Sequence, residues 1–109
     1  MDFDYSSADL KAICEQEKLM IRHYGKPCSR KLRTRLADLR AASSVAELVA
    51  GHPHPLKGDR AGQFALDLTG GKRLVFEPAN KPVPKRKDKS IDWSLVTKIR
   101  IVFIGDYHD

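Results

Sequence analysis

Residues 64–77 have the sequence FALDLTGGKRLVFE, and this stretch decides the fold class. Large apolar side chains alternate with smaller or polar ones over residues 64–68, a pattern typical of a strand with one buried face. Gly70 and Gly71 then predict a two-residue hairpin turn, because both central residues of a type I′ turn need positive φ. A return strand is expected over residues 73–77, so the centre of the chain predicts an antiparallel β-hairpin.

Helical periodicity ahead of this hairpin predicts two helices. The first is expected to begin near Ser7, a good N-cap, and to end at Gly25. Pro27 or Ser29 opens the second, and the short link makes the two helices pack as an antiparallel hairpin. The apolar side chains expected to form the buried seam of the second helix are Leu32, Leu36 and Leu39.

Further elements complete the expected domain. Ser43 and Ser44 can cap a short third helix over residues 45–49. Residues 97–105 are apolar on both faces, as in a central strand covered on both sides. The expected faces of that strand are Ile99, Ile101 and Phe103 against Val102 and Ile104. With an additional strand compatible with residues 3–5, we expect an α+β domain: an N-terminal helical hairpin packed on one face of a twisted, mainly antiparallel β-sheet.

The composition bounds the class of partner. A chain of 109 residues is the size of one domain. Its 20 Lys and Arg outnumber 14 Asp and Glu, which gives a net charge of +6 and favours a polyanion: nucleic acid, a ribosome, an acidic protein or a membrane surface. No apolar run is long enough for a membrane span and the acidic N-terminus lacks a signal-peptide pattern, so we expect a cytoplasmic protein without a membrane partner.

Residues 79–92 predict a long basic loop, since Pro82 and Pro84 disfavour helix and sheet and the cations repel one another. Its cations are Lys81, Lys85, Arg86, Lys87 and Lys89. The loop is either a mobile surface segment or a basic finger for a phosphate-bearing partner. The same choice is open for the basic side of the second helix, which is either solvated or phosphate-tracking.

The cysteines and most histidines have structural interpretations. Cys14 and Cys28 are expected to be buried thiols, since along a helix they lie too far apart for a disulfide. His23 is expected near a helix end, where its charge meets the helix dipole. His52 and His54 stand close together, but no second pair of ligands follows at zinc spacing, so we expect no metal site and no cofactor.

Two polar stretches supply groups for acid–base chemistry on a phosphate. His54 begins a turn that also carries Lys57 and Arg60. His108 follows Asp106-Tyr107, directly after the last expected strand. If strand order brings the stretches together, two imidazoles can exchange protons near neutral pH while cations hold phosphate and a ring stacks on a base. This inventory suits metal-free cleavage of RNA by its own 2′-hydroxyl, with a plain binding domain as the alternative.

The stretch His54–Arg60, HPLKGDR, followed by Gly62–Phe64 and by Arg73 on a second strand, closely resembles the HigB-type toxins of the RelE/ParE superfamily. The terminal Asp106–His108 is similar to that family's C-terminal ending. The resemblance covers most of the chain, and these two elements together are fairly specific, whereas either alone is weak. The helical hairpin is similar too, at Ile13-Cys14-Glu15 and Lys31-Leu32-Arg33.

This resemblance implies the toxin of a type II toxin–antitoxin pair with a microbial RNase-like fold. Such toxins enter the ribosomal A site and cut mRNA there without a metal. His54 would be the first catalytic histidine. Asp106, Tyr107 and His108 would form the terminal catalytic group.

The resemblance also implies binding residues and partners. Lys57 and Arg73 would bind the scissile phosphate or its neighbours. Arg60 either joins them or pairs with Asp59 to brace the turn. The implied partners are mRNA, ribosomal RNA contacted through the basic surface, and a cognate helix-turn-helix antitoxin of the HigA type, with operator DNA reached only through the antitoxin.

The chain departs from the family pattern in two places. The loop at 79–92 is longer than the tight hairpin of compact members, and it can shape the site entrance, contact ribosomal RNA or bind the antitoxin. Asp109 adds negative charge beside His108, which favours the imidazolium and suits a general acid. Two alternatives stay open: a ParE-like toxin of the same fold that poisons another target such as gyrase, and a non-enzymatic module that binds antitoxin and DNA.

Overall fold

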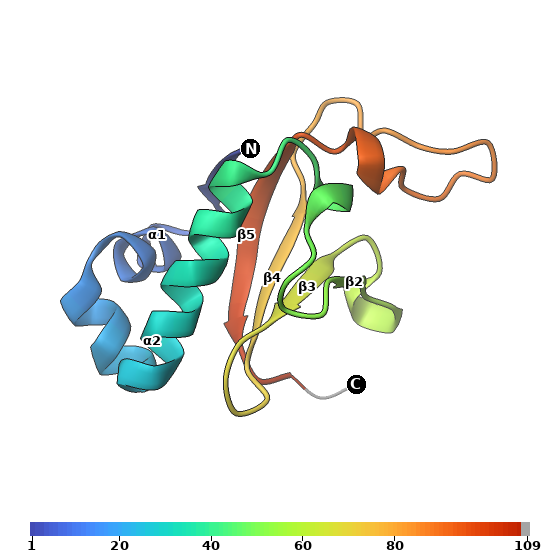
Figure 1. Ribbon diagram of the computed structural model, residues 1–109. Helices are drawn as coiled ribbons and strands as arrows, with labels where there is room; N and C mark the ends of the chain where they lie inside the picture. The colour runs from blue at the N-terminus through green and yellow to red at the C-terminus, as the bar shows by residue number, and fades with distance from the viewer. Residues whose placement is uncertain (108–109) are drawn as a thin grey trace.

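The computed structural model describes residues 1–107 as a helical hairpin packed on a five-stranded sheet (Figure 1). The strands lie in the order β1-β5-β4-β3-β2, with β1 parallel to β5 and the other neighbours antiparallel. The predicted α+β class, the mainly antiparallel sheet and the N-terminal strand are confirmed, while His108 and Asp109 lie outside the described residues. The elements are β1 Asp2–Tyr5, α1 Ala8–Glu15, α2 Glu17–Ala41, η1 Val45–Glu47, β2 His54–Pro55, η2 Gly58–Arg60, β3 Phe64–Asp67, β4 Arg73–Pro78, η3 Trp93–Leu95 and β5 Lys98–Gly105.

The helical hairpin begins as predicted, but its first arm is broken. The Ser7 hydroxyl accepts a hydrogen bond from the N–H of Leu10 at 3.2 Å and caps α1. The single helix expected up to Gly25 is interrupted at Gln16, whose extended backbone separates α1 from α2. Gly25 itself leaves the helical region inside α2, at φ 79°, as a helix-stopping glycine should. The break at Gln16 carries no glycine or proline signal, and it lets apolar residues on either side reach the core.

The third helix is shorter than expected. Only Val45–Glu47 forms a 3-10 turn, and the Ser44 side chain makes no capping hydrogen bond to it. Val49, which the longer helix would have buried, is 87% exposed. The N–H of Val45 donates to the carbonyl of Val96 at 3.1 Å, which ties the start of this turn to the segment after η3.

The core fills the space between the helices and one face of the sheet. The predicted seam of α2, Leu32, Leu36 and Leu39, is buried. The expectation of one buried face for β3 is wrong, because Ala65 on the opposite face is also fully buried. The sheet residues of the core cluster are Phe64, Leu66, Leu74, Phe76, Ile99, Ile101 and Ile104.

The β3–β4 hairpin turns at the predicted glycines, with φ of 60° at Gly70 and 81° at Gly71. Its ladder pairs Asp67 with Arg73. A regular two-residue turn would instead place Asp67 opposite Leu74, so the ladder is offset by one residue. The offset brings a carboxylate and a guanidinium onto the same face of the sheet.

A β-bulge in β5 changes which residues share a face. Val75 of β4 pairs with Phe103, whereas the next residue of β4 pairs with Ile101, so Val102 is an extra residue. Ile104 therefore joins Ile101 in the core. The expectation that Phe103 shares a face with Ile101 is wrong, because strict alternation does not continue across a bulge.

Residues 79–92, called here the basic finger, extend away from the sheet beyond the end of β4 (Figure 1). The segment is irregular, as predicted, but it is cross-linked by a bridge between Lys85 and Ile91. The N–H of Asp92 also donates to the carbonyl of Pro84 at 3.0 Å. The exposed cations of the finger are Lys81, Lys85, Arg86, Lys87 and Lys89.

Cys14 and Cys28 are buried and unbridged, as predicted. Burial raises the pKa of the Cys14 thiol to about 11 and that of the neighbouring Tyr5 hydroxyl to about 12. Within residues 1–107, no helix is both long enough and apolar enough to span a membrane.

Candidate functional site

The sheet face opposite the helices carries a row of aligned residues. Cross-strand partners share a face, and this row consists of His54 on β2, Ala65 on β3, Val75 on β4 and Phe103 on β5. Ala65 and Val75 are fully buried and form the floor of the row. His54 therefore stands at one end of this floor and Phe103 at the other.

Asp67 and Arg73 lie on the same face, beside the row. They are two residues from Ala65 and Val75 along their strands, and side chains alternate with a period of two. The Nε of Arg73 lies 2.8 Å from Oδ1 of Asp67. This contact is an ion pair, and the buried Oδ1 accepts no hydrogen bond of good geometry from residues 1–107.

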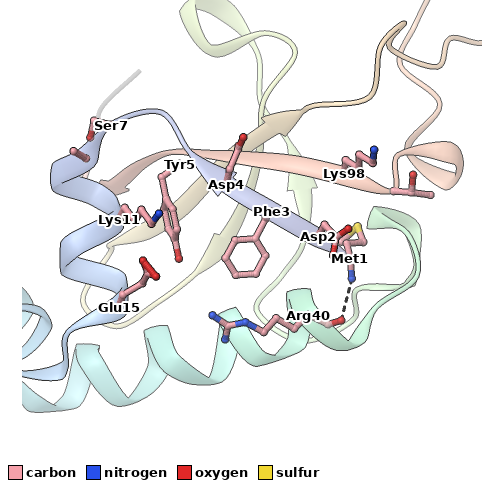
Figure 2. Close-up of a pocket in the computed structure, with 12 residues that line it drawn as sticks. Met1, Asp2, Phe3, Asp4, Tyr5, Ser7, Lys11, Glu15, Arg40 and Lys98 are labelled. Atoms are coloured by element: carbon pink, nitrogen blue, oxygen red, sulfur yellow. Dashed lines mark hydrogen bonds between the residues drawn. The ribbon is translucent and has the colours of Figure 1, made fainter.

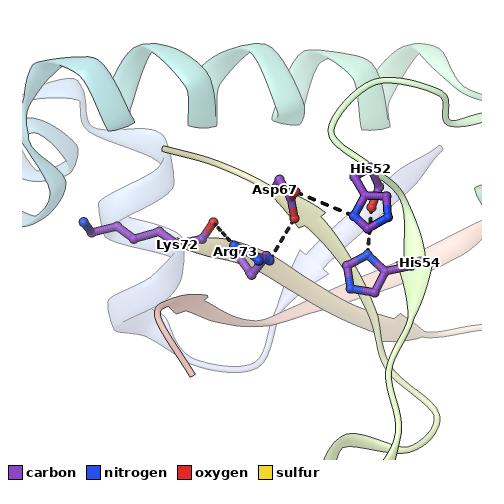
Figure 3. Close-up of polar contacts among 5 residues, drawn as sticks. All are labelled: His52, His54, Asp67, Lys72 and Arg73. Carbon is purple, nitrogen blue, oxygen red and sulfur yellow. Dashed lines mark hydrogen bonds and ion pairs between the residues drawn. The ribbon is translucent and has the colours of Figure 1, made fainter. Parts of the chain in front are cut away.

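Two histidines extend the polar contacts from Asp67 (Figure 3). Oδ2 of Asp67 lies 3.7 Å from Nδ1 of His52. Nδ1 of His54 lies 2.7 Å from the carbonyl oxygen of His52, and the two ring centroids are 4.7 Å apart. Because a carbonyl only accepts, Nδ1 of His54 carries the proton, and Nε2 of the neutral ring keeps its lone pair. His54 thus presents Nε2 as the atom that can take up a proton.

The backbone before His54 explains this arrangement. Gly51 and His52 have φ of 85° and 50°, which turns the chain sharply ahead of β2. The Gly51 carbonyl accepts a hydrogen bond from the N–H of Asp67 at 2.6 Å, which ties the turn to β3. A Cβ at Gly51 would lie 2.7 Å from Nε of the buried Arg35, so only glycine fits without movement. The turn is held between α2 and β3, and it determines where both imidazoles stand.

Arg60 joins the two polar stretches that the sequence singles out. Its guanidinium carbon lies 4.4 Å from the ring centroid of Phe103 and 5.2 Å from that of Tyr107, both within cation–π range. The two rings also meet edge to face, with centroids 6.3 Å apart. Nη1 of Arg60 donates to Oε1 of Gln63 at 2.9 Å. Within residues 1–107 these contacts take the place of the pairing with Asp59, so Arg60 lies on the site face.

The other residues singled out by the sequence lie around this cluster. Asp106 stands beside the β3–β4 turn, where a Cβ on Gly71 would be 3.6 Å from its Oδ2. Lys57 is exposed, directly before η2. His108 lies outside the described residues, so its approach to His54 stays a prediction.

Sequence patterns do not single out Asp67 or Phe103 as residues of the site. Asp67 is the one charged residue in its strand, but the offset ladder hides its pairing with Arg73. Phe103 lies in a continuous apolar run, and only the bulge turns it to the site face. A polar residue inside an apolar strand is the signal that could have drawn attention to Asp67.

A groove of about 1170 Å³ lies at the other edge of the sheet, between β1, the start of α1 and the end of α2 (Figure 2). Tyr5, Glu15 and Arg40 are among its lining residues. Its charges are mixed, and none of the described residues that line it is a histidine. The groove offers no pair of groups that exchange protons near neutral pH, so the face around His54 is the candidate site.

No protein-family model and no curated protein matches the chain. Solved structures do match it. A YoeB/ParE toxin from Agrobacterium tumefaciens has a TM-score of 0.60 at 14% identity, over 99% of this chain and 100% of that one. A YoeB–YefM complex from Staphylococcus aureus has a TM-score of 0.59 at 15% identity, over 100% of this chain and 98% of that one. A YoeB dimer from Staphylococcus aureus has a TM-score of 0.57 at 16% identity, with the same coverage.

At these identities the likeness is one of fold. It agrees with the RelE/ParE-like fold that the resemblance of HPLKGDR and the C-terminal stretch implies, and it says nothing of a HigB type or of individual site residues. The chain has the fold of the YoeB/ParE toxins along its whole length.

Proposed function

We propose that this protein is the toxin of a type II toxin–antitoxin system and that it cuts mRNA on the ribosome as a HigB-type enzyme. The observation that carries the proposal is the meeting of the two polar stretches, where Arg60 of HPLKGDR lies over Tyr107 of the C-terminal stretch. The YoeB/ParE toxin fold supports a toxin. The net charge of +6 supports an RNA substrate.

The proposed reaction is attack of a ribose 2′-hydroxyl on the adjacent phosphate. One of His54 and His108 removes the 2′ proton, and the other protonates the 5′ oxygen as it leaves. The products are a 2′,3′-cyclic phosphate and a 5′-hydroxyl. Nε2 of His54 suits either task, because the His52 carbonyl holds the opposite nitrogen as a donor. The proposed steps need no metal and no cofactor.

Cations on the same face stabilise the charge that develops on the phosphorane. Arg73 is anchored by its ion pair, and Arg60 is held against two aromatic rings. Lys57 is exposed and can move onto a phosphate oxygen. Tyr107 offers a ring for base stacking or a hydroxyl, and Asp106 is proposed as a member of the same terminal catalytic group.

The partners proposed with this function are the ribosome and an antitoxin. The exposed cations of the basic finger suit the phosphates of ribosomal RNA. The antitoxin is a helix-turn-helix protein of the HigA type that neutralises the toxin and carries it to operator DNA. One of the similar structures is itself a complex, of YoeB with YefM.

Induced expression in a bacterial host tests this function. The wild-type protein is expected to arrest growth, and His54→Ala to relieve the arrest, because losing a positioned proton-transfer group slows such reactions by about 100-fold or more. His23→Ala removes an exposed histidine of α2 and is the matched control that should stay toxic. Circular dichroism of each purified variant checks that the fold is kept.

Other outcomes identify the alternatives. Full toxicity of a double variant, His54→Ala with His108→Ala, shows that the assigned site is wrong. Growth arrest without new mRNA ends indicates a ParE-like toxin with another target, such as gyrase. Absence of both arrest and cleavage on translating ribosomes indicates a module that binds antitoxin and DNA.

A further inference from the structure

We propose that His52, His54 and Asp67 bind a transition-metal ion of the zinc class, and that the bound ion blocks proton transfer at His54. The metal binding is independent of the proposed function, whereas the blocking rests on it. His52 belongs to the turn before β2, His54 to β2 itself and Asp67 to the end of β3, and the three side chains stand together on the site face (Figure 3).

The distances are close to those of a metal site. One donor atom of each residue lies within 4.8 Å of the other two. A tetrahedral zinc ion with bonds of about 2.0–2.2 Å holds its ligand atoms roughly 3.3–3.6 Å apart. Nδ1 of His52 already lies 3.7 Å from Oδ2 of Asp67, and the His52 side chain, which is 75% exposed, can rotate to bring the set closer.

Contacts with neighbouring groups orient two of the three donor side chains, His54 and Asp67. The His52 carbonyl holds Nδ1–H of His54 and turns Nε2 outward, which is how metal-binding histidines are commonly oriented. The ion pair with Arg73 fixes the carboxylate of Asp67. Oδ2 of the same carboxylate faces His52, with Nδ1 of that ring 3.7 Å away, so Oδ2 is the oxygen that a metal ion would use.

The donor set indicates the class of metal. Two imidazoles and one carboxylate suit zinc, copper or nickel, whereas magnesium and calcium prefer oxygen ligands alone. Three protein ligands leave a coordination position open for water or for an RNA phosphate. The positive charge of Arg73 near the site lowers the affinity for a cation, so the ion exchanges with solution and is not a permanent part of the fold.

A metal ion bound at His54 would prevent this side chain from accepting a proton in the proposed reaction. A metal ion on Nε2 of His54 occupies the lone pair that would otherwise accept a proton. Metal binding and proton transfer at His54 therefore exclude each other. The ion acts as a reversible off-switch for the site.

Isothermal titration of the full-length protein with zinc chloride tests the site directly. The wild type is expected to bind one zinc ion per chain and to give no response to magnesium. His52→Asn should weaken zinc binding by about tenfold or more, and asparagine tolerates the positive φ at this position. Asp67→Asn should weaken it as well, while His23→Ala, exposed on α2, should bind like the wild type.

Thermal unfolding shows whether His52→Asn and Asp67→Asn are folded. If one of them is not, the other still tests the site. No zinc binding by the wild type, or equal affinity in the wild type and both folded site variants, overturns the metal site.

Cleavage of mRNA on programmed ribosomes tests the blocking. Excess zinc is expected to slow the wild type by about tenfold or more and to leave His52→Asn nearly unaffected. Zinc that accelerates cleavage, or that slows both proteins equally, overturns the off-switch. If the wild type cuts no RNA in the presence of a chelator, the proposed function fails, while the zinc titration still stands or falls on its own result.

Discussion

Arg60 is the residue through which the two ends of the candidate site touch. It extends from η2 over the rings of Phe103 and Tyr107, which belong to β5 and the segment after it. A guanidinium over an aromatic ring contributes about 0.5–1 kcal/mol at a partly exposed position. This contact gives a measurable link between the HPLKGDR stretch and the C-terminal stretch.

A double-mutant cycle measures that link. Arg60→Gln and Phe103→Leu are expected to couple by about 0.5–1 kcal/mol in the free energy of unfolding, measured with urea. The same cycle with Lys57→Gln in place of Arg60→Gln is the control and should give no coupling, because Lys57 is an exposed cation of the same stretch. Additive effects of Arg60→Gln and Phe103→Leu contradict the role given to the cation–π contact.

Gly51 is the residue on which the position of both imidazoles depends. Gly51→Ala combines a positive φ with a contact 2.7 Å from Nε of Arg35, so it should destabilise the protein by about 2–4 kcal/mol. Gly70→Ala, also at positive φ but with nothing within 4 Å, should cost only about 1 kcal/mol. Chemical unfolding compares the two, and equal losses would show that Arg35 simply moves aside.

Among the elements, those with a strong local signal are predictable from the sequence. Ser7 caps α1 through its own hydroxyl, Gly70 and Gly71 need positive φ, and β5 contains an unbroken apolar run over residues 101–104. The features that shape the site have no such signal. The break at Gln16, the extra residue Val102 and the offset of the β3–β4 ladder all come from tertiary packing, which overrides local preference.

The candidate site likewise contains some residues with a clear signal in the sequence and some without one. The titratable and cationic residues of HPLKGDR and of the C-terminal stretch could be named from the sequence because both stretches are unusually polar. The pairing of Asp67 with Arg73 and the turning of Phe103 could not, since both depend on a register that only the assembled sheet defines.

The basic finger is the element whose charge is expected to matter most for ribosome binding. Replacing Lys85, Arg86 and Lys87 by Gln should weaken ribosome binding and reduce the slope of log affinity against log salt by about 2–3. Co-sedimentation with ribosomes at several salt concentrations measures this. The control replaces three exposed cations of α2, Lys18, Lys26 and Arg30, by Gln. An equal loss of ribosome binding in both variants would show that the net charge of the protein, and not the basic finger, determines the affinity.

At the scale of the whole molecule, the two faces of the sheet have different roles: one contributes to stability and the other carries the candidate site. The helices cover one face of the sheet (Figure 1) and bury the core there, and the opposite face carries the polar cluster. The Tyr5 hydroxyl and the Cys14 thiol lie on the helix side, where burial raises the pKa of both groups. The pH dependence of stability in the alkaline range therefore reports on the core and not on the site.

Stability is expected to decrease as the pH rises through the alkaline range. Burial raises the pKa of Cys14 from 9.0 to about 11, so between these values the unfolded thiol ionises while the folded one does not. The contribution of Cys14 to the free energy of unfolding is expected to be level up to about pH 9 and to fall from there to pH 11, and that of Tyr5, whose pKa rises from 10.0 to about 12, falls over the adjoining range. Urea unfolding across this range measures it, and Cys14→Ala should reduce the fall. A level profile through pH 11 contradicts the buried thiol.

The central claim is that HPLKGDR and the C-terminal stretch together cut mRNA on the ribosome. Mapping mRNA 5′ ends after brief induction, in wild type against His108→Ala, tests this claim most directly. We predict new 5′-hydroxyl ends within translated codons in the wild type and their loss in His108→Ala. New ends of equal frequency in the variant, or growth arrest by the wild type without any new ends, would contradict it.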